Sequence, residues 1–91
     1  MIITLPLDLI LDARISSNSK IVYAVLQSLM KGNPKPDQIA SVRATHRDLM
    51  ENSRLSLHTI TKALNILIEA GWISRVLHPG LANEYRFITP V

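Results

Sequence analysis

Residues 45–73 read THRDLMENSRLSLHTITKALNILIEAGWI, a stretch that predicts two short helices joined by a tight turn. Thr45 and Ser56 each precede a helical segment and suit the N-cap position, where a side-chain oxygen accepts from the first amides of a helix. Gly71 tolerates the left-handed conformation in which helices commonly end. Both helices are therefore expected within residues 45–70, with the second one beginning at Ser56.

The second helix divides into an apolar face and a polar face. Its apolar residues fall at i, i+3, i+4 and i+7 on one stripe: Ile60, Ala63, Leu64 and Leu67. The opposite face carries hydrogen-bond donors and acceptors with little apolar bulk: His58, Thr61, Lys62, Asn65 and Glu69. A helix of this kind packs through its stripe and leaves a face that can contact base edges in a DNA groove.

A hairpin follows the second helix. Residues 72–77 alternate loosely and are rich in strand formers, HPGLAN contains the Pro-Gly pair of a turn, and residues 84–89 alternate again. The hairpin is therefore expected over residues 72–89.

The front of the chain divides into a leader and a helix. The leader, residues 1–15, has a candidate strand at 2–5 and a candidate helical turn at 7–11. A helix capped by serine is expected over residues 16–30, and it is apolar over more than half its circumference. That breadth predicts burial on two sides.

Length and composition fit one small domain spanning residues 1–91. A chain of this size buries only about 60–65% of its unfolded surface, which limits it to one modest core. The apolar share of 47% is high for such a chain and favours a partner surface, so a homodimer is expected. No run of about twenty apolar residues can span a bilayer, and no basic region precedes the first apolar stretch. We expect a cytoplasmic protein without membrane association.

Catalysis, metal binding and cofactors are not indicated. The absence of cysteine excludes disulfides, thiolate zinc sites and thiol nucleophiles. The three histidines, His46, His58 and His78, fall in different elements without the spacing of a metal site. The three glycines are scattered, so no glycine-rich phosphate loop exists, and no small-molecule pocket can be inferred. The sequence therefore predicts a protein that is not an enzyme and holds no cofactor.

The positive charges are unevenly placed. The net charge of +3 and the pI near 9.7 give only a mild attraction for phosphate. Four cations cluster around the two helices: Arg43, Arg47, Arg54 and Lys62. Arg75 and Arg86 lie in the hairpin, where their distance from the turn predicts that they face each other across the strands.

This order of elements resembles the winged helix-turn-helix family, in which the hairpin is the wing beside a recognition helix. The matching positions are Leu49, Met50, Leu55, Ser56, Thr59, Ile60, Ala63, Leu64, Leu67, Gly71 and Ile73. The front of the chain is similar to winged domains of plasmid and phage replication initiators and primosome-loading proteins, through Leu5, Pro6, Ile15, Ser16, Lys20 and Tyr23, as is the Asn83-x-Tyr85 pair. Arg54 departs from the pattern, because family members often have glycine there.

The resemblance implies a small α+β fold with three helices and a C-terminal two-stranded wing, and double-stranded DNA as the partner. Residues 39–44 are then a candidate for the short strand that winged domains pair with the wing. The residues expected to contact bases are Leu57, His58, Thr61, Lys62 and Asn65. Those expected to contact the DNA backbone are Arg43, Arg47, Arg54, Ser56 and Thr59. The wing would contribute Arg75, His78, Asn83 and Arg86.

Several alternatives stay open at this point. Leu57 either meets a thymine methyl group or seals the turn, whereas Trp72 is interpreted as a core anchor. The chain is either a sequence-specific transcriptional regulator or a replication-control factor. The alternative from another class is a winged protein-interaction module without specific DNA binding, for which Ile66 and Ile68 at the edges of the polar face leave room.

Overall fold

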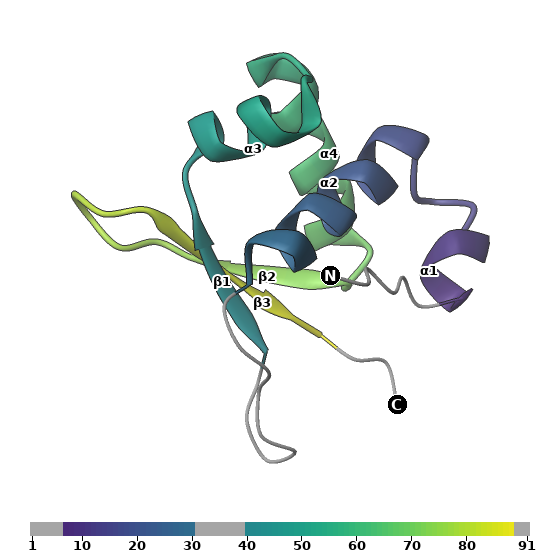
Figure 1. Ribbon diagram of the computed structural model, residues 1–91. Helices are drawn as coiled ribbons and strands as arrows, with labels where there is room; N and C mark the ends of the chain where they lie inside the picture. The colour runs from purple at the N-terminus through teal and green to yellow at the C-terminus, as the bar shows by residue number, and fades with distance from the viewer. Residues whose placement is uncertain (1–6, 31–39, 89–91) are drawn as a thin grey trace.

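The computed structural model describes residues 7–30 and 40–88, and it has the α+β class that the sequence predicts (Figure 1). Within these residues the elements are α1 (Leu7–Leu11), α2 (Ser17–Leu29), β1 (Ser41–Ala44), α3 (His46–Ser53), α4 (Leu57–Glu69), β2 (Ile73–Val76) and β3 (Asn83–Phe87). The strands form one antiparallel sheet in the order β1-β3-β2.

Two counts differ from the expected three helices and two-stranded wing. The described residues contain four helices, because the helical turn expected in the leader forms α1 as a separate helix. The sheet has three strands, because the candidate strand within residues 39–44 forms β1 and pairs with β3 of the hairpin, as expected. A two-stranded hairpin is only marginally stable in water, so the third strand gives the wing a firmer base. The candidate strand at residues 2–5 lies outside the described residues.

Side-chain caps begin three of the helices. The Ser16 hydroxyl accepts from the Ser19 amide at 3.1 Å and starts α2. At α3 the Thr45 hydroxyl accepts from the Asp48 amide, and the Asp48 carboxylate accepts from the Thr45 amide, both at 3.0 Å. This reciprocal pair satisfies two amides that the helix leaves without partners. Ser56 caps α4, as the sequence predicts.

Gly71 ends α4 in the left-handed conformation, with φ of 83°. Its amide donates to the carbonyl of Ile68 at 3.1 Å, and the Trp72 amide donates to the carbonyl of Leu67 at 3.0 Å. These two bonds satisfy carbonyls at the end of the helix and turn the chain into β2. Trp72 is buried in the core, as expected, and its Nε1 donates to Asp12 at 3.0 Å.

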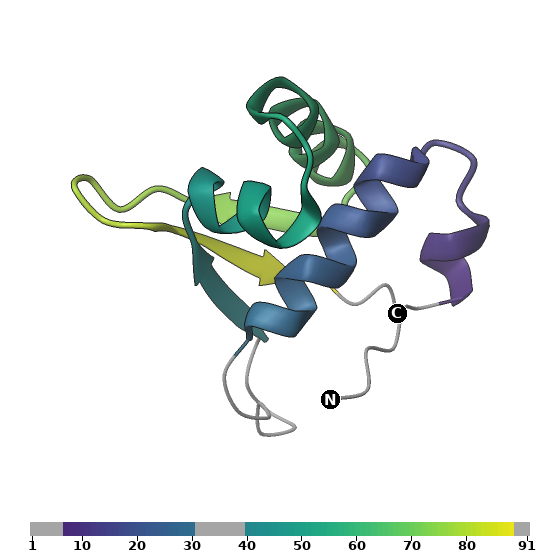
Figure 2. The same cartoon turned by 45° about the horizontal axis from the view of Figure 1, so that its top comes forward.

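The core lies between the sheet and the helices. α2, α3 and α4 lie on one side of the sheet (Figure 2), and α4 packs against α2 through its predicted stripe, whose residues are at most 1% exposed. Tyr23 of α2 meets Phe87 of β3 edge to face, with ring centroids 5.3 Å apart. None of the described helices is long and apolar enough to cross a membrane.

Candidate nucleic-acid interface

The polar face of α4 is not covered by the rest of the described chain. His58, Thr61, Lys62 and Asn65 are exposed, and Leu57 keeps 50% of its surface in contact with solvent. The Thr61 hydroxyl donates to the Leu57 carbonyl at 2.9 Å, which leaves its oxygen as an acceptor toward solvent. All five residues expected to contact bases therefore share one free helix face.

The two residues at the start of α4 that were expected to contact the DNA backbone also form its cap. The Ser56 hydroxyl accepts from the Thr59 amide at 3.3 Å and lies 2.9 Å from the Thr59 hydroxyl. Ser56 is exposed and Thr59 is half-buried. Capping leaves the Ser56 oxygen at the surface beside the first turn of α4.

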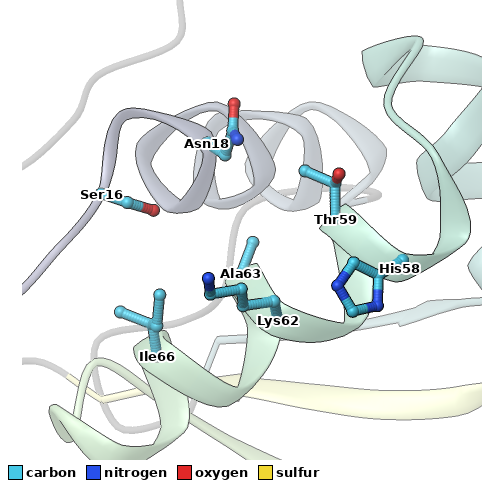
Figure 3. Close-up of a pocket in the computed structure, with 7 residues that line it drawn as sticks. All are labelled: Ser16, Asn18, His58, Thr59, Lys62, Ala63 and Ile66. Carbon is cyan, nitrogen blue, oxygen red and sulfur yellow. The ribbon is translucent and has the colours of Figure 1, made fainter.

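A groove of about 250 Å³ separates the start of α2 from α4 (Figure 3). Ser16, the cap of α2, and Asn18 of α2 line one wall, and His58, Thr59 and Lys62 are among the residues of the other wall. Ser16 and Asn18 were not among the residues predicted to contact DNA. The sequence indicates the serine cap of α2, but nothing local in it indicates that this cap lies beside α4.

Three arginines near the two helices have different surroundings. Arg43 alternates with the buried Val42 and Ala44, so it lies on the sheet face turned away from the helices, with Glu84 as its cross-strand neighbour. Arg47 Nε donates to Glu51 at 3.0 Å along α3. Arg54 is exposed in the turn before α4. The structure therefore brings Arg54 close to the start of α4 along the chain and places Arg43 on another face.

The predicted facing of the two wing arginines is wrong. The register pairs Arg75 with Tyr85 and Arg86 with Ser74. Neighbours along a strand point to opposite sides of the sheet, so Arg75 shares the face of the buried Tyr85 and Arg86 lies on the other face. The prediction failed because the register of a hairpin depends on the geometry and length of its loop. The distance of each arginine from the turn along the sequence does not determine that register.

Glu84 organises the wing and was not predicted. One carboxylate oxygen lies 3.0 Å from His78 Nε2, and the other accepts from Arg86 Nε at 3.0 Å. The bonds from Arg86 and then His78 lower the pKa of Glu84. Arg86 is therefore paired with an acid, whereas Arg75 forms no ion pair with another described residue. Asn83 is half-buried opposite Ala44.

Ile66 and Ile68, which left room for a protein partner at the edges of the α4 face, are half-buried and pack against the core. They contribute more to the interior than to a free surface.

In the part of the chain that the structure describes, no three His, Cys, Asp or Glu side chains gather as a metal site would require.

Two solved structures share this fold. One is described as "N-Terminal domain of DNA binding protein", with a TM-score of 0.76, 16% identity, and cover of 100% of this chain and 76% of that one. The other is described as "Structure of Rep-DNA complex", with a TM-score of 0.75, 16% identity, and cover of 100% of this chain and 77% of that one. No family model matches the chain. No curated protein sequence matches it either.

The class that these observations define is a small α+β domain compatible with a winged helix-turn-helix. The two structural likenesses confirm the predicted resemblance to the winged domains of replication initiators at the level of the fold. At 16% identity they concern the fold and leave the partner of this chain to be argued from its own residues.

Proposed function

We propose that this chain is a sequence-specific double-stranded DNA-binding protein that places α4 in the major groove. The observation that carries the proposal is the free polar face of α4, with exposed His58, Thr61, Lys62 and Asn65 on one side of a helix whose other side is buried. A recognition helix requires this division, because one side must hold the helix in the fold while the other side contacts base edges.

The roles of the residues follow from their chemistry. Asn65 has the amide geometry for a bidentate pair with adenine, and Lys62 suits guanine or a phosphate. Leu57 is positioned to meet a thymine methyl group, since half of its surface is exposed. We propose that Arg47, Arg54, Ser56 and Thr59 hold the DNA backbone beside α4, in agreement with their positions on α3, in the turn and at the cap.

The wing supplies a second, weaker contact in this proposal. Arg75 is the free cation of the hairpin among the described residues, whereas Arg86 and His78 share Glu84. Arg75 therefore contacts phosphate, and His78, Asn83 and Arg86 shape the wing more than they add charge. Arg43 contacts DNA only if the duplex extends past the edge of the sheet.

We propose a role in replication control ahead of transcriptional regulation, acting without catalysis or a cofactor. The support is the fold shared with the protein of the Rep-DNA complex, together with the leader and first helix that resemble replication initiators. We further propose that two copies bind a palindromic site, because a two-fold dimer matches the symmetry of duplex DNA.

A second candidate is a protein-interaction module. It is supported by exposed apolar side chains on the first two helices, namely Ile10 at 41%, Leu11 at 69% and Ile21 at 44% exposure. Isolated exposed apolar residues are ordinary on protein surfaces, so this observation is weaker than the polar face of α4.

The test is selection of bound duplexes from a random library at about 150 mM salt, followed by anisotropy titration of the selected duplex and a scrambled duplex. We expect the selected duplex to bind at least roughly a thousandfold more tightly than the scrambled one. A Lys62→Ala/Asn65→Ala variant should lose this preference. The matched control, Ser41→Ala/Ser74→Ala, changes two residues on the sheet face turned away from the helices and should retain it.

Weak binding without a selected motif, in wild type and variants alike, would contradict sequence-specific recognition. Loss of the preference in the control variant as strongly as in the α4 variant would show that α4 is not the reading element. Symmetry of the selected motif decides between a dimer and a monomer on the DNA.

A further inference from the structure

Arg54 has the left-handed backbone conformation, with φ of 61° and ψ of 25°, and is the one described residue other than glycine with positive φ. A side chain with a β-carbon is disfavoured there, because the β-carbon approaches the following carbonyl oxygen. Glycine adopts the same conformation without that contact. The turn between α3 and α4 is therefore strained by the identity of this residue.

The backbone and its neighbours hold the turn in this shape. The Arg54 amide donates to the Met50 carbonyl at 2.8 Å. The Ser53 hydroxyl donates to the Leu49 carbonyl at 2.6 Å and accepts from the Leu55 amide at 3.2 Å. None of these bonds uses the side chain of Arg54, so replacing that side chain leaves the turn intact.

The guanidinium of Arg54 has no role in the described fold. It is exposed and forms no hydrogen bond or ion pair with another described residue, in contrast to Arg14, Arg47 and Arg86, which each pair with a carboxylate. The residue stands two positions before the cap of α4. An arginine thus occupies a strained position without stabilising the protein through any contact that the structure describes.

We infer that Arg54 binds a DNA phosphate beside the start of α4 and that its backbone strain exchanges protein stability for DNA affinity. The inference rests on the proposed function and goes beyond a simple phosphate contact, because it states that the residue best for folding at this position differs from the residue best for binding. Glycine is best for folding, since it relieves the strain. Arginine is best for binding, since its planar donors fit a phosphate.

Three substitutions separate strain from charge. Arg54→Gly removes both, Arg54→Ala removes the charge and keeps the strain, and Arg54→Lys keeps the charge and the strain. We expect Arg54→Gly to raise the melting temperature by about 4–8 °C, because the relief of strain exceeds the extra conformational entropy that glycine loses on folding. Arg54→Ala and Arg54→Lys should melt close to wild type.

The salt dependence of DNA binding should follow the charge at position 54. We expect Arg54→Gly and Arg54→Ala to bind the selected duplex about three- to tenfold more weakly than wild type. In both, the slope of log affinity against log salt concentration should decrease by about 0.9, the value of one lost phosphate contact. Arg54→Lys should keep the wild-type slope. Thermal unfolding and salt-dependent anisotropy titration give both readouts on the full chain.

The results distinguish a failure of this inference from a failure of the proposed function. If wild type binds a selected duplex and both charge-removing variants bind it with the same affinity and slope, the inference is wrong and the proposed function stands. If Arg54→Gly is no more stable than Arg54→Ala, the strain does not reside in this residue and the inference is also wrong. If wild type itself selects no duplex, the proposed function is wrong and the inference that rests on it is wrong as well.

Discussion

Ser19 is a buried polar residue whose hydroxyl joins α2 to α4. Its Oγ donates to the Ala63 carbonyl at 3.1 Å and lies 3.0 Å from the Ser16 hydroxyl, which itself caps α2. One short chain of hydroxyl groups therefore starts α2 and fixes it against the middle of α4. The position of the proposed recognition helix depends on this contact, because α4 has its widest helix contact with α2.

We expect Ser19→Ala to lower the free energy of unfolding by about 1 kcal/mol, because a buried hydrogen bond is lost. For a domain of this size that corresponds to about 4–8 °C in melting temperature. Ser17→Ala is the matched control, since Ser17 is exposed at the start of the same helix. Thermal unfolding of both variants checks the expectation, and equal melting of the two would contradict the role of the buried hydroxyl.

Local chemistry determined which single residues could be predicted from the sequence. The caps at Thr45 and Ser56, the helix end at Gly71 and the buried Trp72 depend on neighbours within a few positions, and all four are confirmed. The acid of the wing, Glu84, was missed. Its partners are set by the hairpin register, and a register depends on the loop conformation.

At the scale of elements, acidic side chains secure the leader and the wing. Asp12 follows α1 and accepts from Arg14 at 2.8 Å and from Trp72 Nε1 at 3.0 Å, so it ties the leader to the turn after α4. These hydrogen bonds, those from Arg14 first, hold the pKa of Asp12 far below its usual range. Glu84 joins the two sides of the wing, because it contacts His78 after β2 and Arg86 of β3.

The pH dependence of stability follows from these directions. In the folded protein the pKa values of Asp12, Asp48 and Glu84 are all lowered, so folding favours their ionised forms. Their contribution is complete above the ordinary values of 3.8 and 4.5 and is lost as the pH falls through the lower folded values. We therefore expect the free energy of unfolding to be level above about pH 5 and to decrease steadily in more acidic solution.

Urea unfolding at a series of pH values measures this decrease. The comparison is an Asp12→Asn/Glu84→Gln variant, in which two of the three carboxylates cannot ionise. Its stability should be lower than that of wild type at neutral pH and should change less on acidification. A variant that loses as much stability as wild type between neutral and acidic pH would show that these contacts do not control the effect.

Periodicity predicted which helices and strands exist better than it predicted how they pair and pack. The stripe of α4 and the extent of α2 follow from spacing and caps, and the structure has them close to the expected bounds. The pairing of β1 with β3 required a contact between segments about forty residues apart. The resemblance supplied that strand as a candidate, and the residues alone did not determine it.

On the scale of the whole molecule, the helices lie on one side of the sheet and leave α4 with one buried and one free side (Figure 2). The hairpin projects past the helices (Figure 1), so a duplex against the free side of α4 has the wing as a second support in our proposal. The groove between α2 and α4 was not predictable, because it arises from the packing of two helices that are distant in sequence.

The most direct test is a binding comparison between wild type and Asn65→Ala on the selected duplex and on duplexes with each base pair replaced in turn. We expect wild type to lose about 1–3 kcal/mol of binding free energy when an adenine position contacted by Asn65 is replaced. Asn65→Ala should lose discrimination at that base pair and keep it elsewhere. If Asn65→Ala discriminates at every position as wild type does, Asn65 does not read a base and this face of α4 does not select the DNA sequence.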